Sequence, residues 1–161
     1  MKKILGIVLS LVLFAVPAFA ASTLVCTDTK INFVSGIGHK VACTATGDAA
    51  TFTTLQIKDS AGNAINLAGQ YLYLVSVVNG ATGPTDNSDL VLLEDSDSGV
   101  DILSGSGANM IDNAATNTWR PISGSVAYSA PIMGPLFVGA SGNIVSGAIF
   151  VLTLRTVPQA P

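Results

Sequence analysis

The chain has 161 residues, a formal net charge of −3 and a single histidine. The acidic balance argues against a basic surface of the kind that binds nucleic acid. One histidine, without an H-E-x-x-H or G-x-S-x-G motif, is not enough for a zinc peptidase or a typical serine hydrolase.

The first 20 residues have the features of an export signal. Two lysines precede a short apolar run, Ile4–Val16, which Pro17 ends before the small residues Ala18 and Ala20. At about 1.5 Å per residue, this run is short for a membrane span. We therefore predict cleavage after Ala20 and a secreted or periplasmic bacterial protein without a membrane span in its mature part. An uncleaved anchor is the alternative.

Cys26 and Cys43 are the only cysteines of the chain. In an oxidising compartment an even count favours one disulfide. It would close a short loop and stabilise the folded protein by about 3 kcal/mol. A redox or metal site is the alternative, but there is no C-x-x-C motif. His39 lies in a glycine-flanked stretch, and we predict a surface histidine with Lys40 and glycines as its neighbours.

The composition after residue 20 favours strands. It is rich in Gly, Ser, Thr, Asn, Val and Ala, and Glu94 is its only glutamate, so the usual residues of helix surfaces are missing. Short β-branched and aromatic runs alternate with turn residues. We predict strands near 31–33, 40–46, 52–58, 71–78, 89–94, 100–103, 132–138 and 145–153.

Two of these segments have informative patterns. "FTTLQIK" alternates apolar and polar residues, with one slip at Thr53–Thr54, as a half-buried strand does. "YLYLVSVV" is apolar on both faces, which predicts a central strand that is covered on both sides.

Three connectors, 58–65, 94–102 and 139–145, place Ser and Gly between apolar stretches and predict hairpin-type turns. The segment 104–124 is long, polar and without periodicity, so we expect a surface loop there. It contains Trp119, a candidate platform for binding a sugar ligand. A glycosidase would need two carboxylates in a sugar cleft, and one tryptophan gives that alternative little support.

Asp95, Asp97 and Asp101 lie close together in a long stretch without Lys or Arg. Calcium takes about six to eight oxygen ligands, so these three aspartates are the candidate calcium ligands, and calcium is the only cofactor that the sequence suggests. The EF-hand pattern fails at its fifth, sixth and twelfth positions when aligned from Asp95. The simpler interpretation is a solvated acidic turn, with Asp101 pointing outward between two inward apolar neighbours.

Eight short strands in residues 21–161 fit a single all-β domain, a two-sheet antiparallel β-sandwich of jelly-roll or immunoglobulin-like type. The order of an acidic hairpin at Asp95–Asp101, "PIMGPLFV" at Pro131–Val138, an "SGN" turn at Ser141–Asn143 and a final apolar strand at Gly147–Leu154 resembles small phage-encoded proteins. The resemblance implies a virion accessory, decoration or fibre-associated β-sandwich with a structural or binding role and no catalysis.

The sequence therefore predicts an exported, non-enzymatic structural or surface-binding protein whose partner is a protein or glycan surface. A homo-oligomer is compatible with such a role. The alternative is a calcium-dependent module that binds a carbohydrate or another ligand.

Overall fold

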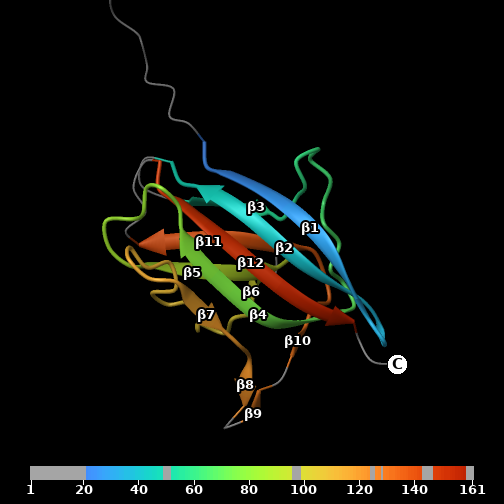
Figure 1. The fold of residues 1–161 in the computed structure, drawn as a ribbon. Coiled ribbons are helices and arrows are strands. Elements are labelled where there is room, and N and C mark those ends of the chain that lie inside the picture. Colours follow the sequence, from blue (N-terminus) through green and yellow to red (C-terminus); the bar gives the residue numbers. More distant parts are fainter. Residues whose placement is uncertain are drawn as a thin grey trace, which may run out of the picture.

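The computed structural model describes residues 21–48, 52–95, 99–123, 126–127, 129–142 and 147–158. Within these ranges the chain forms strands, turns and loops, and two antiparallel sheets pack face to face (Figure 1). The predicted all-β, two-sheet antiparallel sandwich is confirmed. The described part of the chain contains no helix that is long and apolar enough to cross a membrane.

The larger sheet has the order β1-β2-β12-β4-β10, and β7 also pairs with β4. Its strands are β1 (Thr23–Phe33), β2 (Gly36–Thr46), β12 (Ile149–Pro158), β4 (Gln70–Asn79), β10 (Ala130–Pro131) and β7 (Asn117–Trp119). All its strand pairs are antiparallel.

The smaller sheet has the order β3-β11-β5-β6. Its strands are β3 (Phe52–Gln56), β11 (Leu136–Gly142), β5 (Ser88–Glu94) and β6 (Val100–Asp101). A separate ribbon pairs β8 (Ile122–Ser123) with β9 (Val126–Ala127). In Figure 1 the larger sheet lies in front of the smaller one, so its outer face is turned toward the viewer.

The core lies between the two sheets and is formed by alternate residues of their strands, as expected for a sandwich. Phe52 of the smaller sheet and Phe150 of the larger sheet meet edge to face across it, with ring centroids 5.6 Å apart. The largest fully buried side chains are Phe150, Ile57, Leu67, Leu72, Leu90, Leu92, Leu103, Ile111, Ile132, Leu136, Leu152 and Leu154.

The predicted disulfide is confirmed. Cys26 and Cys43 are directly opposite each other on β1 and β2, and their sulfur atoms are bonded. Both side chains are buried in the core, at 2% and 0% exposure. The cross-link therefore fixes the β1–β2 hairpin and at the same time fills space between the sheets.

Several strand boundaries differ from the predicted ones. β1 begins at Thr23 rather than near residue 31, and β11 and β12 each begin about four residues later than expected. The irregularity at Thr53–Thr54 is confirmed, because the β3–β11 register shifts between Val138 and Ala140. The outer face of β4 is less covered than predicted, with Val78 42% exposed.

Two connector predictions were wrong in part. Residues 139–142 belong to β11, and the connection that follows leads to the other sheet, so 139–145 is not a hairpin turn. The segment 104–124 is not wholly a surface loop, because it supplies β7 to the larger sheet and buries Met110 and Ile111 in the core. The few apolar residues of this segment are separated by long polar stretches, so the sequence shows no strand-like alternation there.

Candidate functional site

The inner face of the β1–β2 hairpin extends beyond the disulfide toward the hairpin tip. Strand alternation places Asp28 and Lys30 on the same side of β1 as Cys26, and Lys30 is directly opposite His39 on β2. Val41, two residues from His39, is fully buried in the core. The hairpin thus changes from a hydrophobic to a polar inner face within a few residues.

His39 is not the surface histidine that the sequence predicted. Its Nδ1 lies 2.9 Å from both carboxylate oxygens of Asp28, and its side chain is only 13% exposed. Its backbone N–H donates to Oγ1 of the fully buried Thr156 on β12. The error arose because Asp28 is eleven residues away in the chain and approaches His39 only through hairpin pairing.

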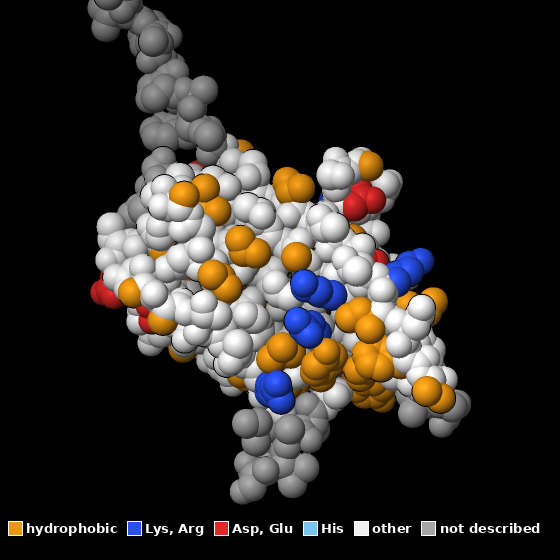
Figure 2. Space-filling view, viewed as in Figure 1, with side chains coloured by type: hydrophobic (Ala, Val, Ile, Leu, Met, Phe, Trp, Pro, Cys, Tyr) orange, Lys and Arg blue, Asp and Glu red, His pale blue; other side chains and the backbone are white. Residues whose placement is uncertain are grey.

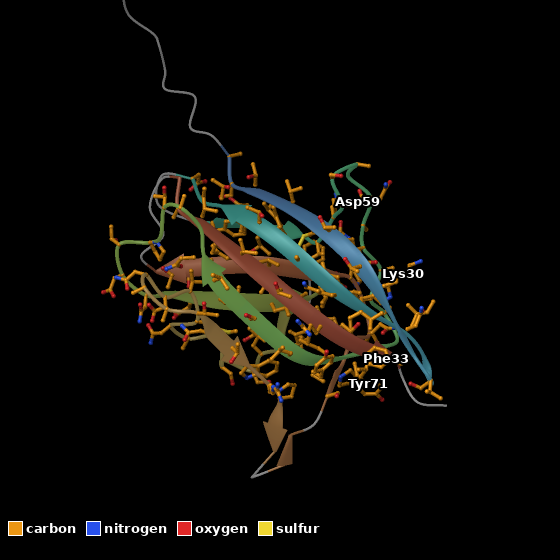
Figure 3. The ribbon with its side chains drawn as sticks, in the orientation of Figure 1. Lys30, Phe33, Asp59 and Tyr71 are labelled. Atoms are coloured by element: carbon orange, nitrogen blue, oxygen red, sulfur yellow. A yellow bond between two sulfur atoms is a disulfide. The ribbon has the colours of Figure 1, made fainter. Side chains whose placement is uncertain are left out.

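An open groove of about 500 Å³ lies between this polar part of the hairpin and the loop after β3. Asp28, Lys30 and His39 line one side, and Asp59 and Asn66 are among the residues of the other. Figure 3 shows the loop of Asp59 running alongside β1, with Lys30 farther along that strand. We call these five residues the hairpin groove.

Asp59 has a structural role in its own turn. Its carboxylate accepts hydrogen bonds from the Asn63 side chain and from the backbone N–H groups of Asn63 and Ala61. These bonds, that of the Asn63 side chain above all, hold the pKa of Asp59 below the usual 3.8. The predicted turn at 58–65 is confirmed, with Gly62 at φ 87° and a bridge from Lys58 to Ala64.

The outer face of the larger sheet carries a second group of side chains. Lys40 on β2 and Arg155 on β12 are directly opposite each other, and alternation points both away from the core. Within the described ranges, neither forms an ion pair with a carboxylate. Arg120 is exposed and directly follows Trp119 of β7. Trp119 pairs with Val75 of β4. The neighbouring Leu74 pairs with Arg155, so Arg120 continues this row beyond β4.

Aromatic side chains lie beside these cations, toward the hairpin tip. The Phe33 ring covers Gly38, where a Cβ atom would lie 2.6 Å from the ring and 2.4 Å from the carbonyl oxygen of Thr156. Tyr71 is opposite Val157 on the neighbouring strands β4 and β12. Figure 3 places Phe33 and Tyr71 at the same end of the sheet. The absence of a side chain at Gly38 allows the Phe33 ring to lie against the sheet.

We call Phe33, Lys40, Tyr71, Arg155 and Val157 the basic–aromatic face. In the sequence its positive residues appear scattered, and only strand pairing brings them together. Figure 2 shows Lys and Arg side chains beside a group of hydrophobic ones over this sheet, while the Asp and Glu side chains in view lie at the margins. The molecule therefore presents a locally positive face despite its net negative charge.

The predicted calcium ligands have different surroundings. Asp101 accepts hydrogen bonds from the backbone N–H groups of Leu92, Leu103 and Gly105, at 3.3, 3.1 and 2.9 Å, and so holds the turn after β6 together. The prediction that Asp101 points into solvent between two inward neighbours was wrong. Its carboxylate is bound to backbone N–H groups, and its neighbour Val100 is 55% exposed instead of buried. Asp95 is exposed with φ 64°, and Asp97 lies outside the described residues.

No group of three His, Cys, Asp or Glu side chains that could hold a metal ion occurs among the described residues. The calcium interpretation stays a prediction that needs a direct test. Trp119, the candidate sugar platform, pairs with Val75 of β4 and is half-buried against the core. Part of its ring surface therefore contributes to packing.

Comparison of this chain with protein-family models, with curated protein sequences and with solved structures finds no match.

Proposed function

We propose that this protein is an exported, non-enzymatic module that binds a surface partner through its basic–aromatic face. The observation that carries the proposal is the pairing of Lys40 with Arg155 beside Phe33 and Tyr71 on one exposed sheet face. Arginine and aromatic side chains are the residue types that contribute most to binding interfaces.

The fold supplies what such a module needs. A sheet face is rigid, so the backbone that carries these side chains is already ordered when a partner binds. The Cys26–Cys43 cross-link braces the strands that carry Phe33 and Lys40. A disulfide is also compatible with an extracellular or periplasmic location. If the resemblance to phage virion accessory proteins reflects common ancestry, the face would serve as a contact to a capsid, fibre or host surface.

Sedimentation of labelled protein with intact bacterial cells and with isolated cell envelopes tests the proposal. The variant Lys40→Glu/Arg155→Glu should lose binding by about tenfold or more, since like charges then oppose the partner. Lys30→Glu/Lys58→Glu is the matched control, because it makes the same charge change at Lys30 in the hairpin groove and at Lys58 in the turn after β3, away from the face. Equal binding by the two double variants would show that the face is not used.

The non-enzymatic part of the proposal needs its own measurement. The Asp28–His39 pair in the hairpin groove is the arrangement in the described chain that most resembles an acid–base pair. We expect no turnover of ester, peptide or glycoside substrates. A robust hydrolytic activity that disappears in Asp28→Asn would contradict the proposal and assign an enzyme instead.

A further inference from the structure

Resting on the proposed function, we infer that the partner of the basic–aromatic face is an anionic polysaccharide. Lys40 and Arg155 provide positive charge without a carboxylate partner in the described structure. Arginine recognises planar carboxylates and tetrahedral sulfates or phosphates by paired hydrogen bonds. The ligand therefore carries repeated negative groups. The aromatic residues of the face indicate that the ligand also has apolar surface between its negative groups.

The geometry of the face suits an extended chain. Lys40 and Arg155 are opposite each other on adjacent strands, and the backbones of such strands are about 4.8 Å apart. The exposed Arg120 continues the row beyond β4, so the positive charges run across the strands rather than along one of them. Phe33 and Tyr71 form a parallel apolar border on the hairpin side. A sugar chain laid across the strands would meet charges on one side and ring surfaces on the other.

Two other occupants fit less well. Insertion into a membrane would rely on the apolar tip of the β1–β2 hairpin, where Val34 is fully exposed and Ile37 is 46% exposed. These two side chains offer little apolar area, and the Phe33 ring lies against Gly38 instead of projecting. A second copy would have to present its acidic residues, which are concentrated between Asp86 and Asp112, to this face. That contact would be head to tail and would form rings or open chains instead of an isologous two-fold dimer.

The charge of the rest of the molecule sets the expected salt dependence. The whole chain is negative, so a polyanion is attracted only close to the face, within about one Debye length, which is about 8 Å at physiological salt. Binding should therefore weaken steeply with ionic strength. The contribution of the two rings should persist, because burial of apolar surface is not screened by salt.

Isothermal titration with polygalacturonate, dextran sulfate and neutral dextran tests the inference. We expect binding to both charged polymers and none to neutral dextran. Lys40→Gln and Arg155→Gln should each weaken binding by about tenfold and reduce its salt dependence. Phe33→Ala and Tyr71→Ala should weaken it several-fold with the salt dependence unchanged, and Lys58→Gln should bind like the wild type.

Three results would overturn the inference. Equal affinity for neutral dextran would show that charge is not recognised. Binding only to phosphatidylglycerol vesicles, with no binding to either charged polymer, would assign a membrane surface. Concentration-dependent growth in light scattering, abolished by Lys40→Gln, would assign a second copy. In each case loss of envelope binding by Lys40→Glu/Arg155→Glu would preserve the proposed function, while retained envelope binding would remove both.

Discussion

The Nδ1 atom of His39 lies 2.9 Å from both carboxylate oxygens of Asp28, on the β1–β2 hairpin that the Cys26–Cys43 disulfide cross-links. The two side chains are 13% and 22% exposed, so water screens the contact only in part. We expect Asp28→Ala and His39→Ala each to lower the free energy of unfolding, with a coupling energy of about 1 kcal/mol in a double-mutant cycle. Urea denaturation measures all four corners of the cycle. Additive effects would show that the contact does not contribute to stability.

The disulfide should account for a substantial part of the stability of this domain. Replacing both cysteines by alanine removes the cross-link over a separation of 17 residues, and we expect a loss of about 3 kcal/mol. Denaturation of the double variant, and of the wild type with and without a reducing agent, provides two independent measurements. If reduction leaves the unfolding midpoint unchanged, the sheet pairing alone holds β1 against β2.

The Asp28–His39 contact could have been predicted from the sequence. Cys26 and Cys43 have their midpoint between Val34 and Ser35, and these two residues form the turn of the β1–β2 hairpin. A disulfide between directly opposite residues fixes the register of the whole ladder. Counting outward from that turn places His39 opposite Lys30, two residues from Asp28. The sequence interpretation paired the cysteines correctly but did not extend the pairing to their neighbours.

The basic–aromatic face could not be predicted in the same way. Lys40 and Arg155 are adjacent only because β12, near the end of the chain, inserts between β2 and β4. Nothing in the local sequence specifies which distant strand pairs with which, since strand pairing depends on packing of the complete sheet. The strand-forming composition and the spacing of turn residues were readable, and they correctly predicted the all-β sandwich.

Asp101 should matter for stability whether or not calcium is present. Its carboxylate accepts three backbone N–H bonds, so Asp101→Ala leaves donors near the core without a partner, and we expect a loss of about 1 to 2 kcal/mol. Asp101→Asn keeps one acceptor oxygen and should lose less. Thermal melting of both variants and the wild type, in millimolar calcium and in chelator, measures this. A melting temperature of the wild type that rises with calcium would instead support the calcium-dependent alternative.

Thr156 connects three strands of the larger sheet from a fully buried position. Its Oγ1 accepts the backbone N–H of His39 at 3.1 Å and donates to the side-chain oxygen of Gln70 at 3.3 Å, next to the register shift in β12–β4 pairing. Thr156→Val retains the shape but leaves that N–H unpaired, so we expect a loss of about 1 to 3 kcal/mol. Thr156→Ser keeps the hydroxyl and is the control. Equal stability of the valine and wild-type proteins would show that the hydroxyl bonds are dispensable.

Asp59 and Asp112 should make stability depend on acid pH. Backbone N–H groups of Ala114 and Ala115 hold the pKa of Asp112 below 3.8, as Asn63 does for Asp59. A carboxyl whose folded pKa is lowered contributes stability that is fully present above its unfolded pKa and is lost as pH falls through the folded pKa. The wild type should therefore exceed Asp59→Asn and Asp112→Asn in free energy of unfolding at neutral pH. This advantage should begin to shrink near pH 3.8 and disappear below the folded values. Carboxyl NMR titration gives the midpoints directly, and a midpoint at or above 3.8 for either residue would contradict the prediction.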